Sequence, residues 1–537
     1  MSEATASWWR SAVFYQIYPR SFQDGNGDGI GDLRGIRSRL DYLGDVLGVD
    51  ALWMSPFYPS PMDDFGYDVA DYCDVDPVFG DLADFDALLA DVHERGMHLI
   101  VDLVPNHTSD QHAWFRASRS SRDDPKRDWY VWRDGKGPGA PPNNWPGVFG
   151  GPAWEWDEAT GQWYLHSFLP SQPDLNWRNR EVREAMYDVM RFWLDRGADG
   201  FRIDVAHYIL KDPDLRDLPL RDDIGETGFK ALGEYDRYQH VHNKGHPDVH
   251  EVFREMRAVL DEYTPERFAV GEIHDFDVHS WASYYGKGDE LHMPFDFSLL
   301  WAPWSAERFR ELIDEVEAAI PERGWPNHVL GNHDETRLAT RFGRGAVRGS
   351  AVLLCTLRGT PTLYYGDELG LSEVEIDVER QQDPWGRRVP GLGRDGCRTP
   401  MPWDGSEHAG FCPPDAEPWL PLGPEAGERN AAAQAADPGS VLSLYRALLA
   451  YRRRSPSLRL GDYAAIDGVP AGCFAHLRTH PGSPAVAAAV NFTGEPMTVP
   501  GLPAGSIVVS TGMDRAGEPV RGSVRLGPHE AVVVEAG

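Results

Sequence analysis

Three acidic residues each come just after a short apolar, strand-like run: Asp204, Glu272 and Asp334. Acids at the carboxyl ends of parallel strands meet at one mouth of an α/β barrel, where catalytic groups gather. Two carboxyl groups roughly 5 to 5.5 Å apart across a glycosidic bond are what retaining glycoside hydrolysis requires. One of them attacks the anomeric carbon and the other protonates the leaving oxygen. Taken singly, each acid could equally be an N-cap or turn residue.

Arg202 stands two residues before Asp204. Side chains two apart on a strand point to the same side, so the guanidinium can keep Asp204 ionised through a charge-assisted hydrogen bond. A purely structural ion pair is the alternative, and the two roles are compatible. For Glu272, burial and neighbouring acids would raise the pKa, which suits a proton donor.

The elements that must position these acids alternate between strand-like runs and helical patterns. One helical pattern ends just before Asp204, with Val182, Met186, Val189, Met190 and Trp193 on one face and Gly197 as its end signal. The eight strand-like runs span residues 12–18, 51–54, 99–104, 201–205, 268–273, 291–297, 329–330 and 362–365. This alternation predicts the α/β fold class, as a (β/α)8 TIM barrel.

Uneven spacing between the runs predicts insertions into the barrel. The excess after the third strand is too long for one helix and a loop, so we expect an inserted lobe there, at residues 104–178. The barrel would then comprise residues 1–103 and 179–456, with further insertions at about 211–248 and 372–437. From residue 457 to 537, short β-type segments between Gly and Pro turns predict an all-β sandwich domain.

Charge and cysteine content exclude several function classes. Acids outnumber Lys plus Arg by 84 to 52, which gives a formal charge of −32. A polyanion would be repelled, so no nucleic-acid partner is expected. The five scattered cysteines form no CxxC pair and suggest neither a disulfide framework nor a zinc site. No signal peptide or membrane-spanning run is apparent, so we expect a cytoplasmic protein without a membrane partner.

Several segments together resemble the α-amylase family, glycoside hydrolase family 13. They are, in order, residues 102–107 (DLVPNH), 172–176 (QPDLN), 200–204 (GFRID), 271–273 (GEI) and 332–334 (NHD). The QPDLN segment, with QIYPRSF at 16–22 and RTPM at 398–401, is similar to the bacterial α-glucosidase and oligo-1,6-glucosidase branch. The resemblance runs from about Trp8 into the C-terminal domain.

This resemblance implies a role for each matching residue. Asp204 would be the nucleophile, Glu272 the acid/base, and Asp334 the carboxylate that holds the 2- and 3-hydroxyls of the sugar. His107 and His333 would bind hydroxyls, and Asp64 and Tyr67 would close the pocket, although Phe65 stands where family members often have Asn. Further residues are expected to line the pocket or its entrance, with core packing as the alternative for each: Phe149, Phe168, Gln172, Arg337, Arg394 and Arg398.

A loop at residues 24–32 (DGNGDGIGD) places hard oxygen donors at alternate positions, which is cation chemistry. The expected donors are Asp24, Asn26, Asp28, Ile30 through its carbonyl, and Asp32. The loop begins like an EF-hand, but Gly35 replaces the final Glu and that reading fails. Resemblance to the glucosidases implies a structural Ca²⁺ or Mg²⁺ distant from the catalytic acids. An Asx-rich turn without an ion is the alternative, and no organic cofactor is expected.

The sequence thus predicts a retaining, exo-acting α-glucosidase for short α-glucosides such as maltose or maltooligosaccharides, as a monomer or homodimer. An α-glucosyltransferase or sucrose isomerase would use the same three acids, and a non-catalytic scaffold is a remote alternative. Val205 resembles the α-1,6-cleaving branch, whereas Ala206-His207 departs from it. We therefore expect α-1,4 or mixed linkage specificity.

Overall fold

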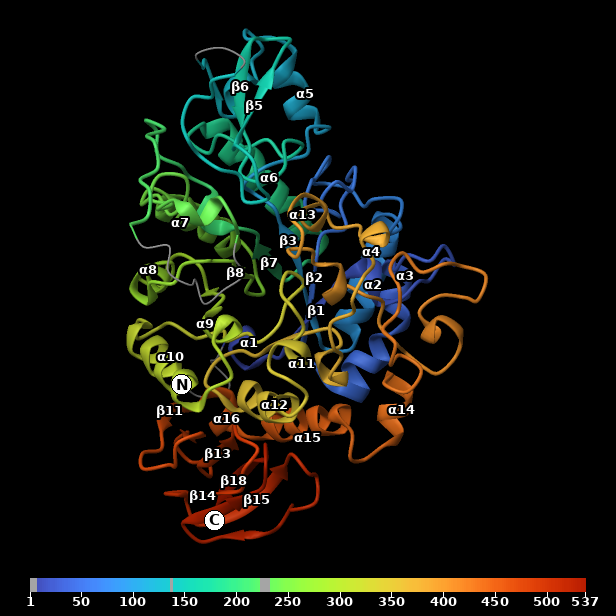
Figure 1. Cartoon of the computed structure of the whole chain (residues 1–537), viewed down its shortest axis with the longest axis vertical. Helices are drawn as coiled ribbons and strands as arrows, with labels where there is room; N and C mark the ends of the chain where they lie inside the picture. Colours follow the sequence, from blue (N-terminus) through green and yellow to red (C-terminus); the bar gives the residue numbers. More distant parts are fainter. Residues whose placement is uncertain (1–6, 136–138, 223–231) are drawn as a thin grey trace.

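The chain forms a parallel barrel with a lobe at one end and a β domain at the other (Figure 1). The structure is a computed structural model and describes residues 7–135, 139–222 and 232–537. Small parts of the predicted segments 1–103, 104–178 and 211–248 therefore lie outside the described residues. No helix in the described ranges is long and apolar enough to cross a membrane.

Seven parallel strands form the central sheet, in the order β10-β1-β2-β3-β7-β8-β9. Bridges from Asp296 to His328 and from Val329 to Thr362 continue the parallel pairing between β9 and β10, at the place predicted for the remaining strand. The closed parallel ring and its connections confirm the predicted TIM barrel. The strands are β1 (Phe14–Ile17), β2 (Ala51–Met54), β3 (His98–Leu103), β7 (Gly200–Ile203), β8 (Phe268–Gly271), β9 (Met293–Pro294) and β10 (Thr362–Tyr364).

Helices surround the barrel and begin and end at the signals that the sequence carries. In α6, Asn179 caps the first turn, and Gly197 at φ 106° ends the helix in a left-handed conformation that favours glycine. The predicted apolar face of α6 is buried. The principal helices are α3 (Leu33–Ser38), α4 (Leu82–Glu94), α6 (Arg180–Arg196), α7 (Val249–Asp261), α8 (Val278–Ser283), α10 (Ala306–Ala319), α12 (Ala346–Thr356) and α15 (Val441–Arg454).

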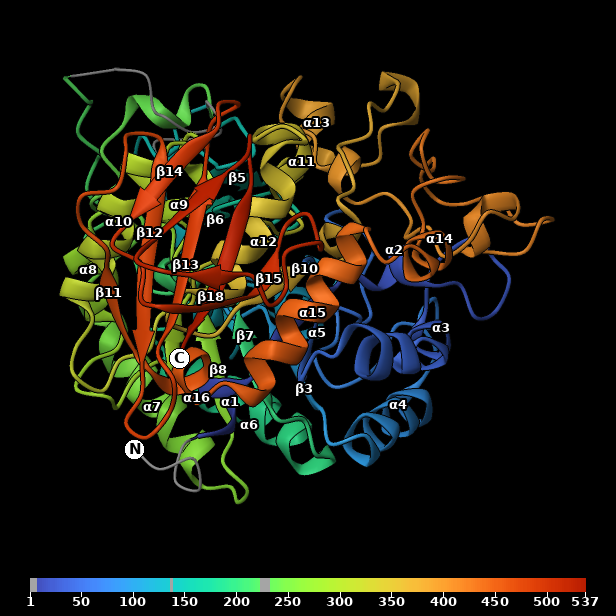
Figure 2. The same ribbon diagram turned by 90° about the horizontal axis from the view of Figure 1, so that it is seen from below.

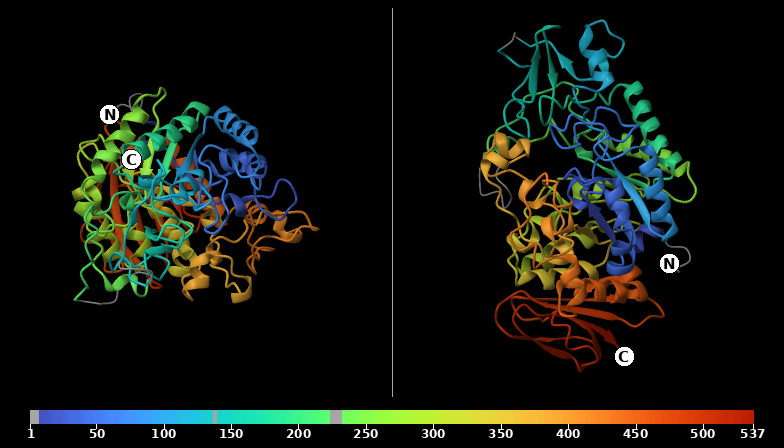
Figure 3. Two further views of the ribbon diagram at one scale, coloured as in Figure 1. Left: turned by 90° about the horizontal axis from the view of Figure 1, so that it is seen from above. Right: turned by 90° about the vertical axis from the view of Figure 1, so that its right-hand side faces the viewer.

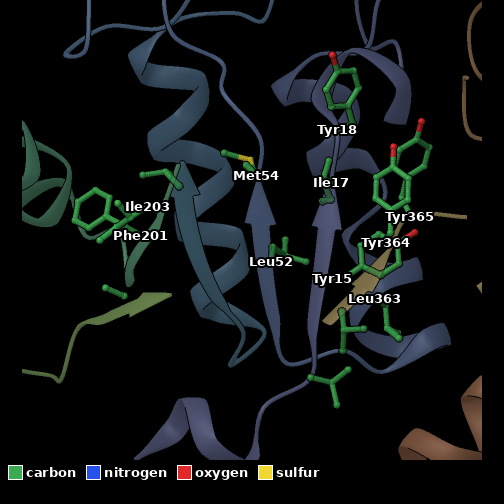
Figure 4. Close-up of a cluster of buried hydrophobic side chains, with 14 of the residues drawn as sticks. Tyr15, Ile17, Tyr18, Leu52, Met54, Phe201, Ile203, Leu363, Tyr364 and Tyr365 are labelled. Carbon is green, nitrogen blue, oxygen red and sulfur yellow. The ribbon is translucent and has the colours of Figure 1, made fainter. Parts of the chain in front are cut away.

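Side chains alternate along each barrel strand between the helices and the barrel interior. Figure 4 shows Tyr15, Ile17, Leu52, Met54, Phe201 and Ile203, which belong to the core between strands and helices. Their strand neighbours form a second apolar cluster in the barrel, which includes Phe14, Trp53, Ile100 and Phe268. The same alternation turns Gln16, Asp102 and Arg202 inward, so polar groups occupy the carboxyl-end layer of the barrel.

The lobe and the C-terminal domain lie at opposite ends of the molecule, as the side view in Figure 3 shows. The lobe holds α5 (Ala113–Ser120) and an antiparallel sheet of β4 (Trp132–Arg133), β6 (Gln162–Leu165) and β5 (Trp154–Asp157). Near it lies α13 (Pro384–Arg388), whose Trp385 packs on Phe149 of the lobe at 4.9 Å between ring centroids. Two separate insertions therefore meet above the barrel mouth.

The C-terminal domain has two antiparallel sheets, seen from below in Figure 2. A shared apolar core between them contains Ala487, Val499, Ile507, Leu526 and Val534, so the domain is a sandwich as predicted. Its larger sheet packs on α12 of the barrel. That sheet joins β11 (Asp462–Ala465), β12 (Cys473–Thr479), β13 (Val486–Asn491), β18 (Ala531–Ala536), β15 (Gly505–Ser510) and β16 (Pro519–Val520); the other joins β14 (Met497–Pro500) and β17 (Ser523–Leu526).

Candidate active site

The three predicted acids line a single cavity of about 1010 Å³ at the carboxyl ends of the barrel strands. Asp204 follows β7 and Glu272 follows β8, and the parallel register that pairs Ile203 with Gly271 sets these two acids side by side. Asp334 comes from the loop after the bridge at Val329. Residues far apart in the chain thus share one mouth because each follows a barrel strand.

Arg202 binds the two central acids at once. Its Nη1 lies 2.6 Å from Asp204 Oδ1 and its Nη2 lies 2.8 Å from Glu272 Oε2. Nη1 also contacts Asp102 Oδ1 at 2.7 Å. The guanidinium is almost completely buried, so these charge-assisted bonds are little screened. One guanidinium thus brings the two carboxyl groups close together, and a short spacing, roughly 5 to 5.5 Å against 6.5 to 9.5 Å in inverting enzymes, is what retaining glycosidases use.

The pKa shifts of the two central acids run in opposite directions, and the shift of Glu272 is opposite to the sequence-based expectation. Burial raises the pKa of Asp204 well above its usual range, although Arg202 opposes this. Burial also acts on Glu272, but Arg202 and a hydrogen bond from His274 outweigh it and hold the pKa of Glu272 below its usual range. Because both acids share Arg202, the protonation of each depends on that of the other.

Two histidines frame the pocket floor in their neutral form. Burial lowers the pKa of His107 to about 4 and that of His333 to about 3. His333 Nε2 lies 2.7 Å from the hydroxyl of Tyr67, and the two rings stack with centroids 5.3 Å apart. His107 Nε2 lies 3.2 Å from the Gln172 amide. Neutral imidazoles can donate and accept hydrogen bonds, as hydroxyl groups of a sugar require.

A buried ion-pair network closes one end of the pocket. Arg394 Nη2 contacts Asp64 Oδ1 at 2.7 Å and Asp383 Oδ1 at 2.6 Å, and its Nη1 contacts Asp334 Oδ1 at 3.1 Å. Gln172 donates to the other oxygen of Asp64 at 3.0 Å. The network ties the loop after β2, the lobe and the 383–394 loop together. The pocket is therefore blind at this end, which is the geometry for one terminal sugar.

The remaining predicted lining residues lie at three different depths. Phe149 and Phe168 line the cavity, and the ring of Phe149 lies 5.1 Å from the Arg394 guanidinium. Arg398 is buried behind the cavity wall and contacts Asp334 Oδ1 at 2.9 Å. Arg337 does not reach the lining. It is buried over the rings of Tyr364 and Tyr365, each 4.9 Å away, so the structure gives it a packing position.

Several pocket groups were not among the predicted site residues. Gln16 Nε2 lies 2.7 Å from His333 Nδ1, and Asp102 Oδ2 accepts a hydrogen bond from Tyr67 at 3.0 Å. His207 and His274 line the cavity beside Glu272. Gln16 and Asp102 could have been found because they fall on the inward phase of their strands. His207 lies three residues after Asp204 and His274 two residues after Glu272, and only the folded loops bring them to the cavity.

Comparison with known proteins places this geometry in a family. A model of the alpha amylase catalytic domain matches residues 16–461. The chain belongs to the α-amylase family. This confirms the assignment made from the motifs, and it makes the chain a glycoside hydrolase of family 13.

The family members most similar in sequence include a protein named probable alpha-glucosidase from Rhizobium meliloti (strain 1021), 45% identical with 93% of each chain covered. An oligo-1,6-glucosidase from Parageobacillus thermoglucosidasius is 42% identical, with 86% of each chain covered. Among solved structures, an alpha-glucosyl transfer enzyme, XgtA, matches with a TM-score of 0.92 and 44% identity over 99% of this chain and 100% of that one. The trehalulose synthase MutB from Pseudomonas mesoacidophila MX-45 matches with a TM-score of 0.88 and 37% identity over 99% of each chain.

The predicted metal loop of this family member is folded by its own side chains. Asp24 Oδ1 accepts from the backbone of Asn26 and Gly27, and Asp28 Oδ1 accepts from the backbone of Ile30 at 2.8 Å. Asp32 caps α3. Within the described ranges, no three His, Cys, Asp or Glu side chains are grouped so that they could hold a metal ion. The alternating oxygen donors suit a hard cation, and in the structure Asp24 and Asp28 accept hydrogen bonds from the backbone of the loop.

Proposed function

We propose that this family member is a retaining α-glucosidase that removes one glucose from the non-reducing end of short α-glucosides such as maltose. The observation that carries the proposal is the Arg202 contact to both Asp204 and Glu272 at the blind end of one pocket. That spacing suits a covalent intermediate, and the blind end suits a terminal sugar. Following the hydrolysis of p-nitrophenyl α-glucoside by proton NMR tests it: release of α-glucose before mutarotation is expected, and initial β-glucose would refute retention.

In the mechanism, Asp204 attacks the anomeric carbon while Glu272 protonates the leaving oxygen. A β-glucosyl bond to Asp204 forms as the α-glucosidic bond breaks, and water then reverses the step with Glu272 as base. Positive charge develops at the sugar ring and favours the anionic form of Asp204. The same step presents Glu272 with an oxygen that accepts its proton. Substrate binding therefore favours an ionised Asp204 and a protonated Glu272, which the first step requires.

Asp64 provides a test of the pocket's blind end. Replacing it in Asp64→Asn removes the charge that would hold distal hydroxyls, while Arg394 keeps its contact with Asp383. We expect kcat/KM for maltose to fall about 10- to 100-fold, the value of one or two hydrogen bonds to a charged group. Steady-state kinetics check this. The exposed neighbour in Asp63→Asn serves as the control and should keep full activity; equal losses in the two variants would contradict the proposal.

A second candidate function is glucosyl transfer or sucrose isomerisation, in which a sugar hydroxyl replaces water in the second step. It is favoured by the likeness to an alpha-glucosyl transfer enzyme and to a trehalulose synthase. Product analysis at high maltose or sucrose concentration separates the two functions. More transfer or isomer products than free glucose would replace hydrolysis as the main reaction.

Linkage preference rests on the residues after the nucleophile. Val205 lines the cavity directly beside Asp204, in an unusual left-handed conformation at φ 34°. Since Val205 is typical of α-1,6 cleavage and Ala206-His207 is not, α-1,4 or mixed specificity remains our proposal. Relative rates on maltose, isomaltose, sucrose and trehalose decide it. Dominant isomaltose hydrolysis would contradict it.

We also propose that the loop from Asp24 to Asp32 binds Ca²⁺ or Mg²⁺ as a structural ion, with Ile30 as a carbonyl donor. Binding to the folded state alone raises its stability, so millimolar Ca²⁺ should raise the Tm of metal-stripped protein by a few degrees. Differential scanning fluorimetry with and without a chelator measures this. The rise should vanish in Asp28→Ala and persist in Asp123→Ala, a change at an exposed acid elsewhere. No rise with either cation would contradict the site.

The division into barrel, lobe (104–178) and sandwich (457–537) is likewise proposed as the domain organisation, with a cytoplasmic monomer or homodimer as the working form. Limited proteolysis tests the domain boundaries, and gel filtration tests the oligomeric state. Cleavage concentrated inside the proposed domains, instead of near their boundaries, would contradict the division.

A further inference from the structure

The imidazole of His274, in the loop after β8, contacts the carboxyl group of Glu272. Its Nε2 lies 2.8 Å from Glu272 Oε1. The other oxygen, Oε2, is already bound by Arg202 Nη2 at 2.8 Å and by the backbone N–H of Val205 at 2.8 Å. Two donors on Oε2 occupy both of its lone pairs, so the acid proton must sit on Oε1. His274 thus touches the one oxygen that gives up and regains a proton.

Aromatic side chains hold the His274 ring in this position. The ring stacks on Phe297 with centroids 4.8 Å apart and an angle of 26°, and Trp301 lies 5.2 Å away. The His274 side chain is 28% exposed, against 4% for Glu272. A packed ring with one edge at the cavity keeps its hydrogen bond to Oε1 at low entropic cost, because its rotamer is already restricted.

We propose that His274 is a positioning residue for the acid and base Glu272, an inference that rests on the proposed hydrolytic function. Donation from Nε2–H to Oε1 takes one lone-pair direction of that oxygen. The O–H of neutral Glu272 is then left with the other direction, into the cavity where the glycosidic oxygen lies. His274 therefore aims the proton and stabilises the carboxylate that remains after transfer.

The proton balance of the two steps leaves His274 unchanged. First, the Oε1 proton moves to the glycosidic oxygen as the bond from Asp204 to the anomeric carbon forms and the glycosidic bond breaks. The Glu272 carboxylate then accepts the Nε2–H bond. Next, a water oxygen bonds to the anomeric carbon, the Asp204 bond breaks, and a water proton returns to Oε1.

The sign of the pH effect follows from this geometry. A hydrogen bond donated to the ionised form lowers the pKa of Glu272, so loss of His274 raises it. Since the acid must be protonated to start the reaction, the basic limb of the kcat/KM profile should move to higher pH by about half to one unit. The charged and titratable groups that face this pair are Arg202, Asp102, Asp204, Asp334, His333, Tyr208, His207 with its ring 5.8 Å away, Lys244 and Asp275.

The experiment compares two leaving groups in His274→Ala and His274→Gln. Maltose needs a proton on its leaving oxygen, whereas the fluoride of α-glucosyl fluoride can leave with little protonation. For His274→Ala we expect kcat/KM to fall about 10- to 100-fold on maltose and less than about threefold on the fluoride, as for weakened general acid catalysis. His274→Gln keeps an N–H donor and should recover part of the loss. His279→Ala, a change at an exposed histidine of α8, is the matched control.

Outcomes separate this inference from the function on which it rests. Equal losses on both substrates, an unmoved basic limb, or a limb that moves to lower pH would overturn the positioning role. Glu272→Gln, assayed on the same two substrates, reports on the function itself. If Glu272→Gln shows the leaving-group dependence and His274→Ala does not, only the His274 inference fails. If Glu272→Gln hydrolyses maltose normally, the proposed catalytic site fails as well.

Discussion

Replacing the nucleophile in Asp204→Asn is expected to lower kcat/KM for maltose by at least about 10⁴-fold. Two nearby carboxylates are poorly placed to replace it, because Asp102 is bound by Arg202 and Tyr67, and Asp334 is bound by Arg394 and Arg398. Losing one carboxylate from Arg202 leaves two partners, so the fold should survive. Steady-state kinetics with circular dichroism measure both effects.

Asp123→Asn, at an exposed acid of the lobe, is the matched control for this variant and should be fully active. A second measurement tests the covalent step directly. Rapid quenching of the wild-type protein with α-glucosyl fluoride, followed by mass spectrometry of peptides, should find one glucosyl group on Asp204. Turnover in Asp204→Asn within tenfold of wild type, or a label on another residue, would remove Asp204 from the role of nucleophile.

Glu272→Gln should show a loss that depends on the leaving group. The amide keeps the shape and can stay beside Arg202 and His274, but it has no proton to give. On maltose we expect a fall of about 10²- to 10⁴-fold, the usual contribution of general acid catalysis. On α-glucosyl fluoride the first step should proceed and the glucosyl-enzyme should accumulate, because water then lacks its base.

Added azide distinguishes the loss of the acid and base from a general distortion of the pocket in Glu272→Gln. It needs no general base, so it should restore turnover of the fluoride by Glu272→Gln and give α-glucosyl azide with net retention. A β-azide product would contradict a β-glucosyl intermediate. If azide restores nothing and both substrates are lost equally, Glu272 acts in binding or structure and another acid must be sought.

The sequence predicted the fold and the positions of the catalytic acids for local reasons. Each acid follows an apolar run, and alternation along the strands places Arg202 and Asp204 on the same face. In a barrel, the carboxyl ends of all strands open on one side, so local patterns are enough to bring Asp204, Glu272 and Asp334 to one mouth. Helix faces and the Gly197 end signal were equally readable.

Only the tertiary structure decided which partners each group has. Arg394 forms an ion pair with Asp64, although the two residues are far apart in the sequence. Arg337 packs over Tyr364 in the core instead of lining the pocket, and His274 contacts Glu272. Such contacts depend on the conformation of the long insertions over the barrel mouth. The hydrophobic periodicity of the local sequence does not specify that conformation.

The tertiary structure also decided the pKa values of Asp204 and Glu272, and so which of the two acids more readily carries a proton. From sequence, Arg202 was a partner for Asp204 alone, and Glu272 was expected to have a raised pKa. In the folded pocket one guanidinium serves Asp204, Glu272 and Asp102 together, and His274 adds a further hydrogen bond to Glu272. Residue types and strand ends therefore determined the chemistry available to this protein. Packing alone decided how charge is divided among the groups that perform it, because pKa values depend on distances and burial that only the fold sets.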